Sequence, residues 1–178
     1  MNSNWKDIFG PGSQFDYRFV KTYEETAERV KALRQLNQKI VLTMGTFDIL
    51  HIGHIEFLEK AKKQGHYLFI LLESDESIRK LKGKNRPFNS YEDRAKLLAG
   101  LETVNYIILL PEFKNEQYDK LIKSLKPDTI ATTKGDPARH HKERQAKMVN
   151  AKLIDVIGKI SNQSTSRLVK ILKKDHWL

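Results

Sequence analysis

The sequence contains no cysteine, no continuous apolar run of about 18 residues and no secretion-signal layout at its N-terminus. The missing cysteine excludes disulfides, thiolate metal sites and a thiol nucleophile. Without an apolar run of that length, we expect no membrane-spanning helix and no membrane insertion. Together these absences fit a cytoplasmic protein of one compact domain, for which 178 residues suffice.

What the chain has in excess is positive charge. Lysine and arginine number 32 against 22 acidic residues, which gives a formal net charge of +10. Such an excess suits anionic partners such as nucleic acid, membrane surfaces or phosphorylated small molecules. The clusters at 82–86 and 139–142 are expected in loops. The six tyrosines are not interleaved with basic residues, so nucleic acid is not the expected partner.

The order of predicted elements indicates the fold. The first twenty residues predict an arm, and a capping box at Thr22–Glu25 begins a helix over 22–36. We therefore divide the chain into an arm and helix at 1–38 and a main domain at 39–178. Short apolar runs then alternate with helical patterns. The runs lie at 40–44, 67–72, 104–110, 128–132 and 153–157, and the helices at 54–64, after Ser90, at 116–125 and at 164–174.

Uninterrupted apolar runs separated by helices are typical of strands buried on both faces. The prediction is a single Rossmann-like α/β domain, a doubly wound parallel sheet of about five strands with helices on both faces. Ligands of such sheets bind beyond the carboxyl ends of the strands, where the strand order reverses. Functional residues are therefore expected directly after the apolar runs.

Unusual residues do follow the first run. Gly45-Thr46-Phe47-Asp48 comes directly after it, and His51-Ile52-Gly53-His54 opens the next helix. Glycine lets the backbone approach an anion closely, and the first N–H groups of a helix favour phosphate. Two imidazoles around this turn can both donate to one phosphate, and they stabilise charge that develops on it.

This segment resembles the His-x-Gly-His signature of the cytidylyltransferase-like nucleotidyltransferase superfamily. The resemblance continues in order through Ser74-Asp75-Glu76, Lys82 to Pro87, Tyr91 to Arg94, and Gln163 to Leu168, and it covers about residues 39–172. It implies transfer of a nucleoside monophosphate from a nucleoside triphosphate to a phosphorylated small molecule, such as a sugar or polyol phosphate, with release of pyrophosphate. It also implies Mg²⁺ as cofactor, bound mainly through the phosphates, and a homodimer.

The resemblance assigns roles to individual positions. It implies that His51 and His54 hold the triphosphate, that Lys82 belongs to a basic loop closing over the phosphates, and that Arg94 contacts the acceptor's phosphate. The implied catalytic residues are His51, His54, Lys82 and Thr165. The implied nucleotide-binding residues are Gly45, Thr46, Phe47, Gly53, His54, Lys134, Gly135, Asp136, Lys159, Ser164 and Thr165. The implied acceptor-binding residues are Asp48, Asp75 and Arg94.

The choice of base stays open. Glycerol-phosphate cytidylyltransferases carry arginine where this chain has Lys159, and Ser166 replaces a threonine of their last motif. The Lys134-Gly135-Asp136 segment is closer to the corresponding block of heptose-phosphate adenylyltransferases. We therefore favour ATP, and keep CTP with a glycerol-phosphate-like acceptor as the alternative.

Two other classes of protein compete with this interpretation. Class I aminoacyl-tRNA synthetases share the His-Ile-Gly-His letters, but they need tRNA-binding domains and a Lys-Met-Ser-Lys-Ser-like loop that this sequence does not show. A nucleotide-binding or DNA-binding regulator without turnover would suit the charge of +10. The ordered set of glycine, histidine, lysine and hydroxyl residues favours the enzyme.

Overall fold

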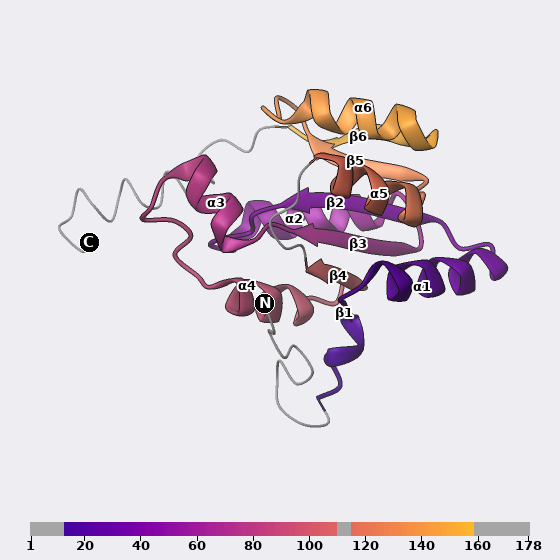
Figure 1. Ribbon diagram of the computed structural model, residues 1–178, viewed down its shortest axis with the longest axis horizontal. Coiled ribbons are helices and arrows are strands. Elements are labelled where there is room, and N and C mark those ends of the chain that lie inside the picture. Colours follow the sequence, from indigo (N-terminus) through magenta and orange to yellow (C-terminus); the bar gives the residue numbers. More distant parts are fainter. Residues whose placement is uncertain (1–12, 110–114, 159–178) are drawn as a thin grey trace.

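The computed structural model describes residues 13–109 and 115–158, in which strands and helices alternate (Figure 1). The strands are β1 (Phe19–Val20), β2 (Ile40–Gly45), β3 (Tyr67–Leu72), β4 (Tyr106–Leu109), β5 (Thr129–Thr133) and β6 (Lys152–Ile157). The helices are a 3₁₀ turn η2 (Asp16–Arg18), α1 (Tyr23–Gln35), α2 (Ile52–Lys62), α3 (Asp75–Lys82), α4 (Tyr91–Ala99), α5 (Asn115–Leu125) and α6 (Arg139–Val149). None of these helices is long and apolar enough to cross a bilayer.

The strands of the described ranges form one parallel sheet in the order β1-β4-β3-β2-β5-β6. The predicted Rossmann-like α/β class is thus confirmed. Successive strands step outward from β2 to β3 and β4, and the chain then crosses back to β5 and β6 on the other side. The order therefore reverses between β2 and β5, and this is where such sheets bind ligands.

The sheet has six strands where we expected about five. The additional strand is β1, which pairs Phe19 with Ile107 and Val20 with Ile108 of β4. It lies in the stretch predicted to be an arm, and both of its residues are buried. Two residues are too few to show a strand period in the sequence, and only the neighbouring strand makes them a strand.

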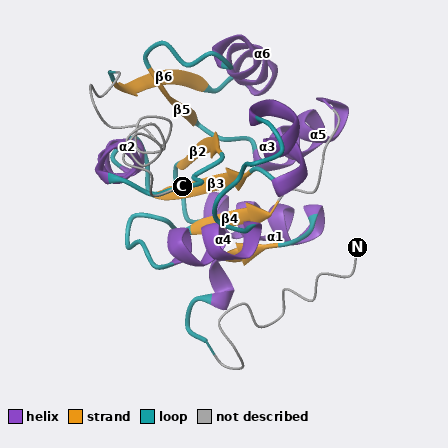
Figure 2. Ribbon diagram, turned by 90° about the vertical axis from the view of Figure 1, so that its left-hand side faces the viewer, coloured by secondary structure: helices purple, strands orange, loops and turns teal. Residues whose placement is uncertain are grey.

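The core lies in two layers, one on each face of the sheet, as continuous apolar strands require. Figure 2 looks along the sheet, with α2 on one side of the strands and α5 and α6 on the other. The first layer joins alternate residues of β2 and β3 to α2 and α4. The second joins the remaining strand residues to α1, α5 and α6. The sheet is thus packed on both faces, and the functional residues follow directly from its buried strands.

Two helices, α3 and α6, were not predicted from the sequence; of the two basic clusters expected in loops, 139–142 lies in α6, whereas 82–86 follows α3 as a loop apart from Lys82. Lys82 is the last residue of α3, and Arg139 to Lys142 form the first turn of α6. Ser74 caps α3, since its Oγ accepts a hydrogen bond from the N–H of Ser77. Both helices are rich in charge and bury few apolar residues, and neither was recognised as a helix in the sequence. The predicted helix at 164–174 lies outside the described residues.

Candidate active site

The candidate site lies at the carboxyl ends of β2 and β5, where the strand order reverses. Gly45 ends β2 and stands beside Leu72 of β3 in the register. The N–H of Glu73 donates to the carbonyl oxygen of Gly45 at 3.2 Å, which extends the ladder past the strands. On the other side, Lys134-Gly135-Asp136 follows β5. Two of the segments singled out in the sequence are thus neighbours in space.

The turn after β2 depends on Phe47, which takes a left-handed backbone conformation with φ of 43°. Such a conformation is uncommon for a bulky residue and marks a position that the surrounding structure holds. The Phe47 ring is buried and lies 5.3 Å from the His54 ring, centroid to centroid. A Cβ on Gly45 would come within 2.9 Å of that ring, so glycine is required there. The Gly-Thr-Phe-Asp turn thereby supports one of the two histidines.

His51 and His54 lie together at the start of α2. His51 is the residue that caps the helix, and the two rings stack with centroids 3.9 Å apart. Burial lowers the pKa of both; the pKa of His54 falls to about 4 through burial and the neighbouring His51 and Lys82. The Nδ1 atoms of both rings are buried and find no partner among the described residues. At neutral pH the pair is therefore neutral, beside helix N–H groups that have no intrahelical partner.

Lys82 is brought to this turn from the end of α3. Its Nζ donates to the Thr46 hydroxyl at 3.1 Å, and the side chain is otherwise exposed. α3 lies beyond the arrowheads of β2 and β3 (Figure 1), and the bond to Thr46 brings the Lys82 ammonium back to the turn after β2. A cation on a tether of this kind can reach a phosphate at the histidines.

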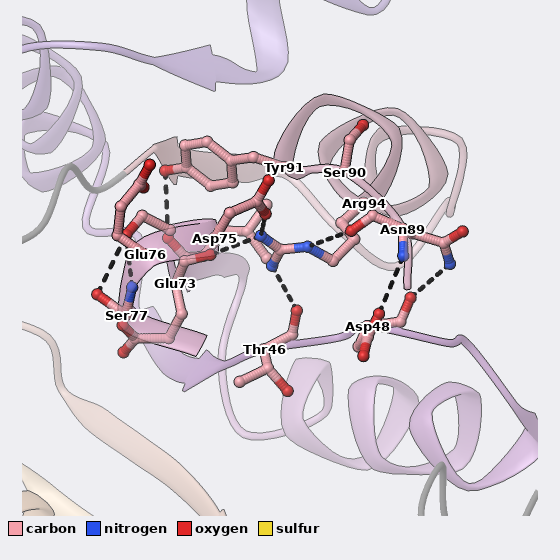
Figure 3. Close-up of polar contacts among 12 residues, drawn as sticks. Thr46, Asp48, Glu73, Asp75, Glu76, Ser77, Asn89, Ser90, Tyr91 and Arg94 are labelled. Carbon is pink, nitrogen blue, oxygen red and sulfur yellow. Dashed lines mark hydrogen bonds and ion pairs between the residues drawn. The ribbon is translucent and has the colours of Figure 1, made fainter. Parts of the chain in front are cut away.

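Asp48 does not face the site as we expected of an acceptor-binding residue. Its carboxylate is 1% exposed and accepts hydrogen bonds from Arg86 Nε at 2.6 Å and from the backbone N–H of Phe88 and Asn89 at 2.7 and 3.1 Å. Arg86 also makes an ion pair with it. Figure 3 shows Asp48 turned toward Asn89. The Asp48 carboxylate therefore accepts its hydrogen bonds from the loop between α3 and α4, and it holds that loop against the turn after β2.

Arg94 is the second departure from the expected acceptor contacts. Its side chain is fully buried, and its guanidinium donates to the carbonyl oxygens of Thr46, Glu73 and Asn89 at 2.6, 2.8 and 3.3 Å. It also forms an ion pair with Asp75 at 2.8 Å (Figure 3). The guanidinium ties the end of β2, the end of β3 and the start of α4 to one point. These contacts give Arg94 and Asp75 a positioning role at the strand ends, and their contact with the acceptor stays a prediction.

The segment after β5 is built around Asp136. Gly135 has a φ of 79°, which glycine adopts without strain. The Asp136 carboxylate accepts from the Thr132 hydroxyl at 2.7 Å and from Lys142 Nζ at 2.6 Å. Burial alone raises the pKa of Asp136, but the bonds from Lys142 and Thr132 outweigh it and lower the pKa. Lys134 is exposed at the strand end. Lys159, Ser164 and Thr165 lie outside the described residues.

A pocket of about 450 Å³ opens on the α5 and α6 side of the same strand ends. Its size is that of a small-molecule site. Two of its polar residues, Glu73 and Tyr118, were not singled out in the sequence, and Lys142 was noted there only as part of the basic cluster at 139–142. Glu73 directly follows β3, and that position was the one signal that could have found it. The lining residues are Met44, Gly45, Thr46, Glu73, Ser77, Ile78, Leu81, Lys82, Tyr118, Asp136, Pro137, Ala138, His141, Lys142 and Gln145.

Comparison with known proteins agrees with this geometry. The family model called cytidylyltransferase-like matches residues 42–176, most of the chain. The chain belongs to the cytidylyltransferase-like family. The match begins within β2. It includes the Gly45–His54 turn, the carboxyl ends of β2 and β5 where the strand order reverses, and the residues that line the pocket.

Curated relatives of this cytidylyltransferase-like chain carry the name "Bifunctional protein HldE". The one from Aliarcobacter butzleri is 44% identical over 111 residues, which are 62% of this chain and 23% of that protein. The one from Pseudomonas fluorescens SBW25 is 35% identical over 92% of this chain and 34% of that protein. The chain thus spans about a quarter to a third of the curated relatives' length. A solved lipopolysaccharide core biosynthesis protein from Thermoplasma volcanium is 26% identical, with a TM-score of 0.55, over 71% of this chain and 99% of that one.

Metal ligands are sparse in the described part of this family member. There, no three histidine, aspartate or glutamate side chains gather as a metal site. Asp48, Asp75 and Asp136 each bind an arginine or a lysine of the chain. These aspartates therefore do not fit a resident metal site.

Proposed function

We propose that the protein is a nucleotidyltransferase that moves a nucleoside monophosphate from a nucleoside triphosphate to a phosphorylated sugar or polyol and releases pyrophosphate. One observation carries the proposal. Lys82 binds Thr46 at the rim of a small-molecule pocket, and the neutral histidine pair lies at the helix start that follows the same turn, at the reversal of the strand order. Membership of the cytidylyltransferase-like family supports it.

The arrangement suits in-line transfer at phosphorus. An acceptor phosphate oxygen attacks the α-phosphorus; the new P–O bond forms as the bond to the β-phosphate breaks, and pyrophosphate leaves with that electron pair. The histidines and the α2 N–H groups donate to the phosphoryl oxygens, and Lys82 neutralises charge. Catalysis is then positioning and electrostatic stabilisation, with no covalent enzyme intermediate.

Mg²⁺ enters this proposal as a companion of the triphosphate. A Mg²⁺ ion neutralises phosphate charge, and it keeps several waters and few protein ligands. Because the three aspartates are engaged by cations, we assign them no part in holding it.

The proposal also covers which nucleotide and which acceptor the enzyme uses. The Lys134-Gly135-Asp136 turn resembles that of heptose-phosphate adenylyltransferases and favours ATP over CTP. The Thermoplasma volcanium relative is described as a lipopolysaccharide core biosynthesis protein, which agrees with a saccharide substrate. A sugar phosphate is therefore the favoured acceptor, and a cytosolic homodimer is the favoured state of the enzyme.

The test is pyrophosphate release by the whole chain with ATP, CTP, GTP or UTP across a panel of sugar and polyol phosphates. We expect release with ATP and a sugar phosphate, and a loss of about 10²-fold or more in kcat for His54→Ala. No release with any combination, alongside tight DNA binding that weakens steeply with salt, would favour the regulator instead.

A further inference from the structure

Glu73 places a carboxylate in the pocket whose lining also includes Thr46 and Lys82. It follows β3 directly, and its backbone is held by Gly45 on one side and by the Arg94 guanidinium on the other. Its side chain lies in the pocket and accepts a hydrogen bond from the Tyr118 hydroxyl of α5 at 2.8 Å. Two different elements therefore present one acid and one phenol to the same cavity.

The cations near this carboxylate are engaged elsewhere. Arg94 binds the backbone oxygen of Glu73 and the carboxylate of Asp75. Lys142 binds Asp136 at 2.6 Å. Among the described residues, the bond from Tyr118 is the only hydrogen bond to the Glu73 carboxylate. Burial raises its pKa, while Tyr118, Arg94 and Lys142 oppose that rise.

A carboxylate offers about four lone-pair directions, and a single hydrogen bond from the described residues leaves most of them available to a ligand in the pocket. A half-buried acceptor of this kind is costly unless donors satisfy it. The rest of the wall supplies apolar contact through Met44, Ile78 and Leu81. A ligand with hydroxyl groups on a carbon frame matches both the acceptor at Glu73 and the apolar wall. A ligand with a second anionic group does not, because it has no proton to donate to the Glu73 carboxylate.

We propose that Glu73 and Tyr118 recognise the hydroxyl groups of the acceptor and select an uncharged polyhydroxyl body over one with a second anionic group. The inference rests on the proposed function, since it names the acceptor class of that site. The Glu73 carboxylate accepts from the hydroxyls, and Tyr118 fixes its orientation. A carboxylate or second phosphate on the acceptor would meet the charge of Glu73 and be rejected.

Calorimetric binding to the whole chain tests this without turnover. The probes are the 1-phosphates of glucose, galactose and mannose, and the uronic acid 1-phosphate of whichever binds best. We expect the parent to bind the neutral sugar about 10–100-fold more tightly than the uronic acid. Glu73→Gln should bind the sugar about tenfold more weakly and bring the ratio to within about threefold, and Tyr118→Phe should weaken sugar binding less.

Glu76→Gln is the matched control, because it removes the same charge from the exposed first turn of α3. It should leave both affinities unchanged, and urea unfolding checks that each variant is folded. A parent that binds none of the sugars or binds the uronic acid equally well, or a folded Glu73→Gln that keeps the parent's ratio, overturns the inference. If the sugars bind with the expected ratio but no triphosphate yields pyrophosphate, the proposed function fails while the hydroxyl recognition stands.

Discussion

Replacing Arg94 by alanine should lower the free energy of unfolding more than a substitution at an exposed position does. The fully buried guanidinium serves three carbonyl oxygens, of Thr46, Glu73 and Asn89, and the Asp75 carboxylate. Removing one partner of a buried ion pair costs about 3–5 kcal/mol, and each orphaned carbonyl costs about 1–3 kcal/mol. The groups share one cavity, so these costs overlap. We expect a loss of about 3–5 kcal/mol, a large part of the roughly 5–15 kcal/mol that holds a domain folded.

Urea unfolding followed by far-ultraviolet circular dichroism measures this loss. With a slope of about 2 kcal/mol per molar urea, the midpoint should fall by roughly 1.5–2.5 M. Arg94→Lys keeps the charge but cannot fork to four acceptors, so it should lie between parent and alanine variant. Arg79→Ala is the control, because Arg79 is 49% exposed and pairs with the same Asp75 at 3.8 Å; it should cost less than about 1 kcal/mol. An Arg94→Ala midpoint no lower than the Arg79→Ala midpoint would refute the reasoning.

Three other substitutions separate the parts of the turn after β2. In Gly45→Ala the added Cβ would lie 2.9 Å from the Phe47 ring. The variant should lose about 1–3 kcal/mol of unfolding free energy in urea, and its kcat/KM should fall at least about tenfold. Activity within twofold of the parent would contradict this. His54 has a folded pKa of about 4 and an unfolded pKa of roughly 6.5, so the unfolded chain takes the proton first and stability falls as pH drops through that window. By pH 5 the loss of unfolding free energy should be about 1–2 kcal/mol. His54→Gln should abolish this loss when stability is measured against pH. A variant whose stability falls with pH as the parent's does would be inconsistent with a buried neutral ring. Lys82→Ala should leave the urea midpoint within about 0.5 kcal/mol of the parent but lower kcat at least about tenfold, and equal kcat would exclude it from the phosphate site.

The elements that sequence could predict are those whose pattern is independent of tertiary contacts. The run at 67–72 became β3 with the same bounds, and the capping box at Thr22 begins α1 one residue later, with the Thr22 side chain accepting from the N–H of Glu25. β1 could not be predicted, because two residues become a strand only through their neighbour β4. α3 and α6 were missed because they are short, rich in charge and bury few apolar residues.

The candidate site shows the same division. The pattern after the first strand was enough to find His51 and His54, because a helix start at the carboxyl edge of the sheet is a local signal. Lys82 was assigned only through the family resemblance, and the structure brings it near them from the end of α3. Asp48 and Arg94 are the residue types that bind phosphates and metals, but those types also satisfy buried backbone groups. Sequence alone does not tell the two uses apart, because the difference lies in partners up to 48 residues away, as between Arg94 and Thr46.

The neutral histidines also determine where positive charge at the site must come from. With its pKa near 4, His54 is uncharged at neutral pH, so it contributes a directed hydrogen bond but no net charge. Arg94 and Arg86 are cations, but their charges are balanced by Asp75 and Asp48. Lys142 is likewise paired with Asp136. Lys82, whose described hydrogen bond goes to a neutral hydroxyl, therefore leaves its charge available to a bound phosphate. Orientation and charge neutralisation thus fall to different residues, the first to the α2 histidines and the second to the end of α3.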